Sequence, residues 1–235
     1  MPLLANTKSF CKDATNIDPM LTHLFFDFDG VIANSIHSQV EKWNDMLARF
    51  NKDMRLDETY LRQNWTGDVK EFYKNKLNFS DEEFEAQIHV WRALGGKITP
   101  APLVDGMQES LIELGKKFTL VVVSSNYKEH INPVLINGNV SHLFHSVFGP
   151  DEANGAVKPH PDAYLVPLRH LGIERENAMV LGDSVGDIHC AHAAGIRSIA
   201  CAWGWNSREM LAATEPEFIA EKPSDLLRFL TSTNL

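Results

Sequence analysis

Two carboxylates one residue apart follow a short run of aromatic and β-forming residues near the start of the chain. The run Leu24–Phe26 leads into Asp27 and Asp29, and Gly30 follows at once. This pattern predicts a buried strand ending in a turn, where a glycine with positive φ re-aims the second carboxylate. Both carboxylates can then face one site at the carboxyl end of the strand, which suits a metal ion, a nucleophile, or both. A solvated acidic turn is the simpler interpretation of these residues alone.

Two further polar stretches lie at predicted element boundaries, one at the end of a strand and one just before a helix. Ser124-Ser125-Asn126 follow the apolar run Thr119–Val123, and Lys158 precedes Pro159 on a stiff loop before a predicted helix. Hydroxyls and free amides at a strand-to-helix junction form an anion site, because the helix N-terminus directs unpaired N–H groups at a ligand. Serine and asparagine are also ordinary helix caps, and a lone lysine is usually a solvated surface charge.

A third stretch, Gly182-Asp183-Ser184-Val185-Gly186-Asp187, places two carboxylates four residues apart after the apolar run Ala178–Leu181. Such acids can cap the helix that follows. Ligation of a hard cation is the more specific interpretation of Asp183 and Asp187.

The secondary structure that must position these residues is predicted to change along the chain, from helices alone to alternating helices and strands. Apolar residues spaced by four, three, four and three predict one amphipathic helix from Ile36 to Phe50, and helical patterns without a convincing strand continue to about Leu94. From Gly106 onward, helices and strands alternate, which predicts a parallel sheet with helices on both faces and ligands at the carboxyl ends of the strands. The helical segment is therefore an insertion into an α/β core.

Taken together and in this order, the four polar stretches resemble those of the haloacid dehalogenase superfamily, over roughly residues 22 to 230. The insertion resembles the helical cap of its phosphoglycolate-phosphatase and β-phosphoglucomutase branch, and Ala202–Asn206 with Glu215-Pro216 is most similar to the phosphoglycolate type. The resemblance implies a Rossmann-like parallel-sheet core over 22–35 and 103–235, a helical cap with hinges over 36–102, and an N-terminal leader over 1–21. Asn34 departs from the pattern, since relatives usually carry Asp there.

The resemblance also implies roles for the residues that match its motifs. Asp27 would be the nucleophile that becomes an aspartyl phosphate, and Asp29 the general acid that later activates water. Ser124 would hold a phosphoryl oxygen, and Lys158 would offset the crowded negative charge. The implied Mg²⁺ ligands are Asp27, the backbone carbonyl of Asp29, and Asp183, with Asp187 as a further ligand or as support for the others.

Substrate contacts are predicted beside these groups. Ser125 and Asn126 belong to the anion site. Trp65 and Thr66 lie in the stretch Asn64–Gly67, where this branch places its substrate-selecting loop, and Arg62 is a further candidate. Trp65 as a packing residue inside the cap is an equally good interpretation, since tryptophan is often largely buried.

The expected activity is Mg²⁺-dependent hydrolysis of a small phosphate monoester of the phosphoglycolate or sugar-phosphate type. A phosphosugar mutase of the β-phosphoglucomutase kind is the main alternative, but such enzymes usually carry histidine where this chain has Gln39. A non-catalytic binding protein that kept the fold is a second alternative, for which loss of Asp27 or Lys158 would be the expected mark.

Composition and charge narrow the classes of function and the cellular environment that the chain can have. The 235 residues include 44% hydrophobic and 23% charged residues and carry a net charge of −9 without a basic run, which disfavours nucleic-acid binding. No apolar stretch approaches the length of about 18 residues that spans a membrane. The odd number of cysteines, Cys11, Cys190 and Cys201, shows no metal-ligand spacing and favours a reducing cytoplasm. A small-molecule phosphate ester is the expected partner, bound by a monomer or homodimer.

Overall fold

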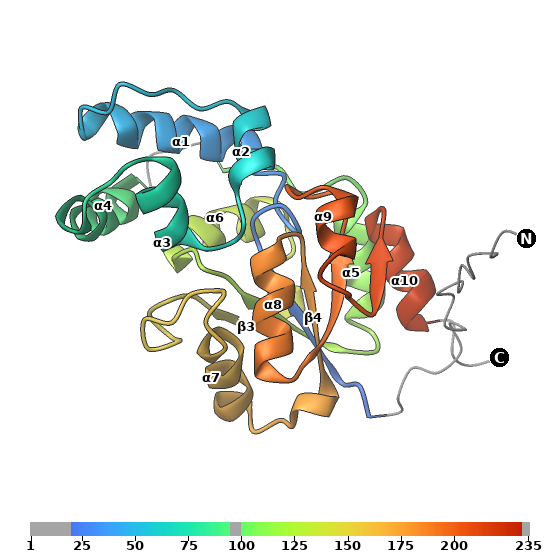
Figure 1. Ribbon diagram of the computed structural model, residues 1–235. Helices are drawn as coiled ribbons and strands as arrows, with labels where there is room; N and C mark the ends of the chain where they lie inside the picture. Colours follow the sequence, from blue (N-terminus) through green and yellow to red (C-terminus); the bar gives the residue numbers. More distant parts are fainter. Residues whose placement is uncertain (1–19, 95–99, 232–235) are drawn as a thin grey trace, which may run out of the picture.

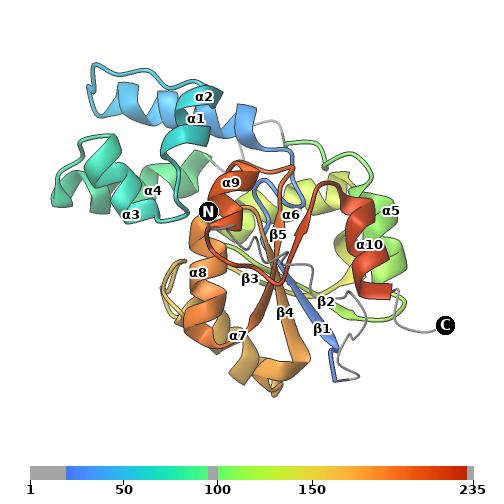
Figure 2. The same ribbon diagram turned by 45° about the vertical axis from the view of Figure 1, so that its right-hand side comes forward.

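Six parallel strands form one sheet in the order β3-β2-β1-β4-β5-β6 (Figures 1 and 2). The computed structural model describes residues 20–94 and 100–231. The strands are β1 His23–Phe26, β2 Thr119–Val123, β3 Phe144–Phe148, β4 Ala178–Gly182, β5 Arg197–Cys201 and β6 Phe218–Ala220. Central β1 pairs with β2 and β4, so that Phe26 lies opposite Val122 and Leu181. Being covered on both faces, the central strands are apolar throughout instead of alternating.

Helices cover both faces of the sheet. The helices α5 Met107–Leu114, α6 Lys128–Asn137 and α10 Pro223–Thr231 pack with Leu24 and Phe26 on one face. The helices α7 Asp162–Leu171 and α8 Val185–Ala194 pack with Phe25 on the other, and α9 Arg208–Ala212 packs against α8 and β5. Short 3₁₀ turns at Ser141–Leu143 and Arg175–Asn177 precede β3 and β4.

The segment between β1 and α5 is helical throughout its described elements: α1 Ile36–Arg49, α2 Glu58–Asn64, α3 Val69–Glu71 running into a π-helical turn Phe72–Lys76, and α4 Asp81–Leu94. These helices gather at one end of the molecule, beyond the edge where the strands end (Figures 1 and 2). They share an apolar cluster of their own, and Trp205 is its one fully buried member from the core. We call α1–α4 with their connecting loops the cap.

The two chain crossings between the cap and the core lie side by side. The amide of Asn34 donates to Pro102 O at 2.9 Å, and the amide of Val104 donates to Ile32 O at 2.9 Å. The predicted fold class, a parallel-sheet core with an inserted helical cap, is confirmed. The domain boundaries at 35/36 and 102/103 stay predictions. The leader falls outside the described residues except for positions 20 and 21, as does the 95–99 part of the cap. Strand β6 and helix α9 were not predicted, because three and five residues leave almost no pattern. Helix α10 was not predicted either, although its buried Leu226 and Leu230 lie at helical spacing.

Candidate active site

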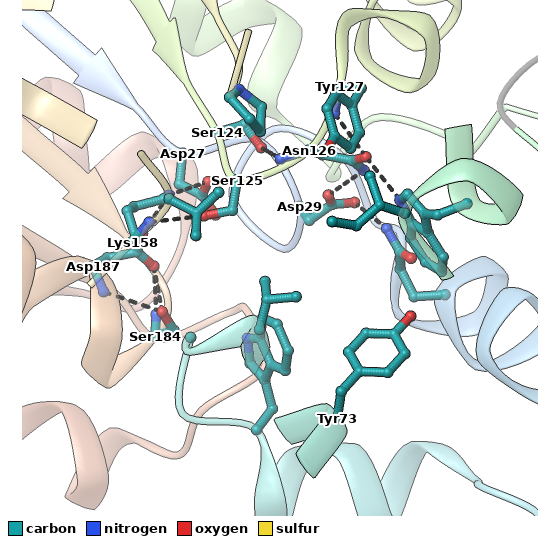
Figure 3. A pocket seen from close by; sticks show the side chains of 18 of the residues that line it. Asp27, Asp29, Tyr73, Ser124, Ser125, Asn126, Tyr127, Lys158, Ser184 and Asp187 are labelled. Atoms are coloured by element: carbon teal, nitrogen blue, oxygen red, sulfur yellow. Dashed lines mark hydrogen bonds and ion pairs between the residues drawn. The ribbon is translucent and has the colours of Figure 1, made fainter. Parts of the chain in front are cut away.

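Polar residues from the predicted stretches meet at the carboxyl edge of the sheet. Asp27 follows β1, Ser124 follows β2 and Asp183 follows β4, while Lys158 comes from the loop before α7. Since neighbouring parallel strands end at the same edge, the register brings Asp27, Ser124 and Asp183 together, and Lys158 joins them from its loop. Figure 3 shows the side chains of Asp27, Lys158 and Asp187 pointing toward one another on one side of a cavity, with Asp29 facing them.

Lys158 links two carboxylates at the bottom of this site. Its Nζ lies 2.5 Å from Asp27 Oδ1 and 2.5 Å from Asp187 Oδ1, and it also donates to Val123 O at 3.3 Å. Burial opposes the charge on this lysine, but Asp187 and Asp27 outweigh that effect and raise the pKa of the ammonium group. Lys158 is therefore a permanent cation held against Asp27.

Negative charge nevertheless exceeds positive charge here. Asp27, Asp183 and Asp187 are all buried, and each offers one oxygen within 4.8 Å of the others. Burial, reinforced by the charge of Asp187 and opposed by Lys158, raises the pKa of Asp27 to about 7. Burial and the neighbouring Asp27 and Asp187 likewise raise the pKa of Asp183. An oxygen-only donor set with one compensating lysine fits a small, hard divalent cation such as Mg²⁺.

Asp183 is held in place by the backbone around it. The amide of Trp205 donates to Asp183 Oδ2 at 2.7 Å. A Cβ atom at Gly30 or at Gly204 would overlap the Asp183 carboxylate, and Gly30 also has φ 84°. Glycine is therefore required at both positions by close approach, and at Gly30 by conformation as well.

Asp187 differs from the other two carboxylates because both of its oxygens are already engaged. One binds Lys158, and Oδ2 accepts from Ser184 N at 3.0 Å and from Ser184 Oγ at 2.6 Å. Ser184 in turn caps α8 in a reciprocal capping box with Asp187. Asp187 thus caps α8 and orients Lys158, and its predicted role as a metal ligand or as support for the other ligands stays a prediction.

Asp29 is held by two amide side chains, one from each part of the molecule. Gln39 Nε2, from cap helix α1, donates to Asp29 Oδ1 at 2.8 Å. Asn126 Nδ2, from the core, donates to Asp29 Oδ2 at 2.9 Å, and Asn126 Oδ1 accepts from the cap's Trp91 Nε1 at 3.3 Å. The side chain of Asn126 therefore orients Asp29, and its predicted contact with an anion stays a prediction.

The two serines after β2 keep their hydroxyl protons available. Ser124 Oγ accepts from the amide of Asn126 at 3.1 Å, and Ser125 Oγ accepts from the amide of Lys158 at 3.1 Å. Among the described residues, none accepts a hydrogen bond from either hydroxyl. Both can donate to an anion bound beside Asp27.

A cavity of about 350 Å³ lies between the core and the cap. Its lining includes most of the predicted site residues, namely Asp27, Asp29, Trp65, Ser124, Ser125, Asn126, Lys158 and Asp187. A volume in this range accommodates a small ligand, against about 300–1,000 Å³ for small-molecule sites in general.

The comparison with known proteins agrees with this geometry. Residues 24–201 match the family described as haloacid dehalogenase-like hydrolase. The chain belongs to this family.

Its relatives extend over nearly the whole chain. A phosphoglycolate phosphatase of Mannheimia succiniciproducens is 28% identical over 220 residues, covering 87% of this chain and 96% of the relative. One from Haemophilus influenzae is 26% identical over 218 residues with the same coverage. A predicted phosphatase from Clostridium acetobutylicum has a similar structure, with TM-score 0.78, 21% identity, and coverage of 90% of this chain and 99% of that one. The prediction of an enzyme of the phosphoric monoester hydrolase class is confirmed.

Two predicted substrate contacts of this haloacid dehalogenase-like hydrolase do not reach the cavity. Arg62 Nη1 donates to Gly204 O at 2.7 Å, and Thr66 Oγ1 donates to Glu71 Oε2 at 2.8 Å. Neither residue is part of the lining. Each side chain instead hydrogen-bonds within the protein, to a partner that a sequence pattern could not reveal.

The loop that carries Trp65 docks on the core of the hydrolase through its backbone. Asn206 Nδ2 donates to Trp65 O at 2.8 Å, and the amide of Gly186 donates to Thr66 O at 2.7 Å. A Cβ at Gly67 would lie 2.9 Å from the Gly186 Cα, so the two glycines allow the close contact. The loop thereby closes one side of the cavity.

Several lining residues were not predicted as site residues. Gln39 is one of them, and the sequence distinguishes it only from the histidine of mutases. It lies three residues after Ile36 and four before Trp43, on the buried face of α1. A polar residue on an apolar face was the available signal. Tyr73, Gln87 and Trp91 gave no such signal, because aromatic residues and a lone glutamine in a helical segment are ordinary.

Proposed function

We propose that this protein is an Mg²⁺-dependent phosphatase that hydrolyses a small phosphate monoester through an aspartyl-phosphate intermediate. The observation that carries the proposal is the placement of Asp27 and Asp29 at one cavity. Asp27 is paired with Lys158 at 2.5 Å, and Asp29 is held by two amides on the facing side. A nucleophile and a general acid are thus both oriented toward the space where an ester would bind.

The first chemical step would break the ester bond between phosphorus and the leaving oxygen. A carboxylate oxygen of Asp27 bonds to phosphorus, and Asp29 donates a proton to the departing alcohol. Lys158 and the hydroxyl of Ser124 hold the phosphoryl oxygens and reduce the repulsion between two anions. In the second step Asp29 takes a proton from water, whose oxygen displaces Asp27 and releases inorganic phosphate.

The residues present fit a magnesium ion. Asp27 and Asp183 supply buried carboxylate oxygens near one another, and Asp187 supports the site through Lys158. When bound, the cation supplies charge that neutralises the phosphate and fixes Asp27 for attack. The backbone carbonyl of Asp29 is the third ligand implied by the family resemblance.

The relatives suggest the first substrates to test. Since full-length relatives are named phosphoglycolate phosphatase, phosphoglycolate comes first, and sugar phosphates follow. A reducing, cytoplasmic environment and a monomeric or homodimeric state are kept in the proposal as predictions. Both described cysteines, Cys190 and Cys201, are buried free thiols, which agrees with such an environment. Every helix in the described ranges is too short or too polar to cross a bilayer.

Mutase chemistry is the less favoured alternative. The amide of Gln39 already donates to Asp29 and, unlike an imidazole, cannot carry a proton at neutral pH. A non-catalytic role is disfavoured because the Asp27–Lys158 pair is intact and opens on a cavity.

The proposal is tested by measuring phosphate release from phosphoglycolate and a set of sugar phosphates, with Mg²⁺ and with excess chelator. We expect release that requires Mg²⁺ and returns when the metal is restored, with Ca²⁺ substituting poorly because its coordination is larger and more flexible. Full activity in chelator would contradict the metal assignment. Interconversion of glucose 1-phosphate and glucose 6-phosphate without phosphate release would instead indicate a mutase.

A further inference from the structure

The end of the cavity in the cap differs chemically from the end in the core. It is lined by Trp43, Trp65, Tyr73, Phe84, Ile88 and Trp91, among others. The Trp43 ring centroid lies 5.4 Å from that of Trp65 and 6.0 Å from that of Trp91, so the rings hold one another in place. Such a wall offers an apolar surface that is formed before a ligand binds.

Positive charge is missing from this end. Of the described residues that line the cavity, Lys158 is the only basic one, and its ammonium group is shared between Asp27 and Asp187. Lys42 lines a separate small cavity on another side of Asp29, where its Nζ lies 3.5 Å from His130 Nδ1. The phosphate and the metal therefore use the charge that the core supplies, and the described residues of the cap add no basic side chain to the lining.

The two nearest candidates for a compensating arginine are also engaged. Arg62 binds the carbonyl of Gly204, as described above. Arg92 is paired at the surface with Asp151 at 2.6 Å and with Glu129 at 3.0 Å. Asp151 lines the cavity but is already paired with Arg92, so an additional carboxylate in the ligand would find no free cation among the described lining residues. Burying an unpaired anion in such surroundings is strongly unfavourable.

Neutral hydrogen-bonding groups are present, however. Tyr73 OH accepts from Trp43 Nε1 at 3.2 Å, which leaves its own proton free to donate, and Figure 3 shows this hydroxyl directed into the cavity. Burial raises the pKa of Tyr73, so the phenol stays neutral. Gln87 is buried and lines the same end, and its amide has no hydrogen bond to any described residue.

We propose that the cap selects an uncharged leaving group with a flat, ring-sized apolar part and a few neutral polar atoms that meet Tyr73 and Gln87. Such a group can lie against the tryptophan rings, whereas the carboxylate of phosphoglycolate would have no cation and the hydroxyls of a sugar would have too few partners. This substrate class rests on the proposed phosphatase function for the position of the phosphate.

Binding of two phosphonates that cannot be hydrolysed tests this selectivity apart from catalysis. In 2-phenylethylphosphonate a phenyl ring stands where 3-phosphonopropionate, the analogue of phosphoglycolate, has a carboxylate. By isothermal titration calorimetry with Mg²⁺, we expect the phenyl compound to bind about tenfold or more tightly. Equal binding, or tighter binding of 3-phosphonopropionate, would overturn the proposal.

A charge added at the cap end should reverse the order. Gln87→Arg supplies the missing cation, so 3-phosphonopropionate should bind about tenfold or more tightly than it does to the wild type. Gln87→Met has a similar size without the charge and should keep the wild-type order. If both variants shift the two affinities alike, Gln87 does not face the ligand and the argument from Tyr73 and Gln87 fails. Thermal melting reports whether each variant folds, and if Gln87→Arg does not, the wild-type comparison decides alone.

Hydrolysis separates this proposal from the proposed function. The rates of phosphate release from benzyl phosphate and from phosphoglycolate are compared, since both leaving groups are primary alcohols. Release from neither ester, together with the expected binding preference, would contradict the phosphatase function and leave the selectivity standing. A kcat/KM about tenfold higher for phosphoglycolate would contradict the selectivity and leave the phosphatase function standing.

Discussion

The two ends of the cavity are built in different ways. At the core end, Asp27, Ser124 and Asp183 directly follow strands, so the sheet's backbone ladder fixes their positions. At the cap end, the positions of Trp43, Trp65 and Trp91 depend on how helices and loops pack. The first end is charged and the second is aromatic and neutral.

From this difference we expect the core end to carry out phosphoryl transfer and the cap end to select the substrate. In the proposed mechanism the core end contacts only the phosphoryl group, which all phosphate monoesters share. The cap end would contact the leaving group, which differs between them. A change at the core should therefore reduce turnover of every substrate equally, and a change at the cap should alter their ranking.

The largest effect is expected from Asp27→Asn, which removes the nucleophile and a proposed metal ligand together. Turnover of every ester should fall below detection in a phosphate-release assay, while the melting temperature shows that the protein still folds. A variant with substantial activity and unchanged metal dependence would show that Asp27 is not the nucleophile.

Gln39→Leu changes a cap residue that orients a core residue, because Gln39 donates to Asp29, the proposed general acid. Loss of the hydrogen bond to the Asp29 carboxylate should cost about 1.5–3 kcal/mol, or roughly tenfold to a hundredfold in kcat, for all substrates alike.

A matched variant, Gln39→Glu, keeps the length of the side chain but places a carboxylate against Asp29. Repulsion between the two carboxylates should lower kcat at least as far as Gln39→Leu does. If Gln39→Leu changed only KM and left kcat unchanged, Gln39 would belong to substrate selection and not to catalysis.

Trp65→Ala tests the cap end. Loss of aromatic contacts worth about 0.5–1.5 kcal/mol should lower kcat/KM for benzyl phosphate by roughly twofold to tenfold, with less effect on methyl phosphate. Trp65→Phe, which keeps a ring, should recover most of the difference. A large fall in melting temperature with equal losses on both esters would support the packing interpretation of Trp65 instead.

The smallest effect concerns the junction between the two parts. His130 in α6 contacts Trp91 O through Nε2 at 3.0 Å, and its ring stacks on Trp91. Burial and the charge of Lys42, against smaller opposite effects of Asp29 and of the contact with Trp91 O, lower the pKa of His130 to about 4. The unfolded chain binds this proton near its ordinary pKa of about 6.5. Between those values the unfolded state holds more protons, so stability should fall as the pH is lowered from about 6.5 toward 4.

His130→Asn removes the titrating group and keeps a polar side chain. The fall in melting temperature between pH 7 and pH 5 should be a few degrees smaller for this variant than for the wild type. An identical fall in both proteins would mean that His130 does not contribute to the acid sensitivity.

The sequence by itself determined the parallel sheet, the helical insertion and which residues lie at the core end of the cavity. Residues that directly follow an apolar strand must lie at its carboxyl edge, so the positions of Asp27, Ser124 and Asp183 could be derived from local patterns. The extent of the family match, residues 24–201, covers these stretches. The short strand β6 and helix α9 left too little pattern to detect.

Only the tertiary structure decided which groups serve Asp29 and what fills the cap end. Asn126 and Gln39 are 87 residues apart in the chain, yet their amides hold the two oxygens of one carboxylate. Likewise, Trp205 of the core joins the rings of Trp43 and Trp65. Such contacts depend on the packing of segments far apart in sequence, and the same residue types would give equally good local patterns as simple core or surface residues. Long-range packing leaves no periodic signal in the sequence. The residues of the cap end could therefore not be predicted from local patterns, whereas those that follow the strands could.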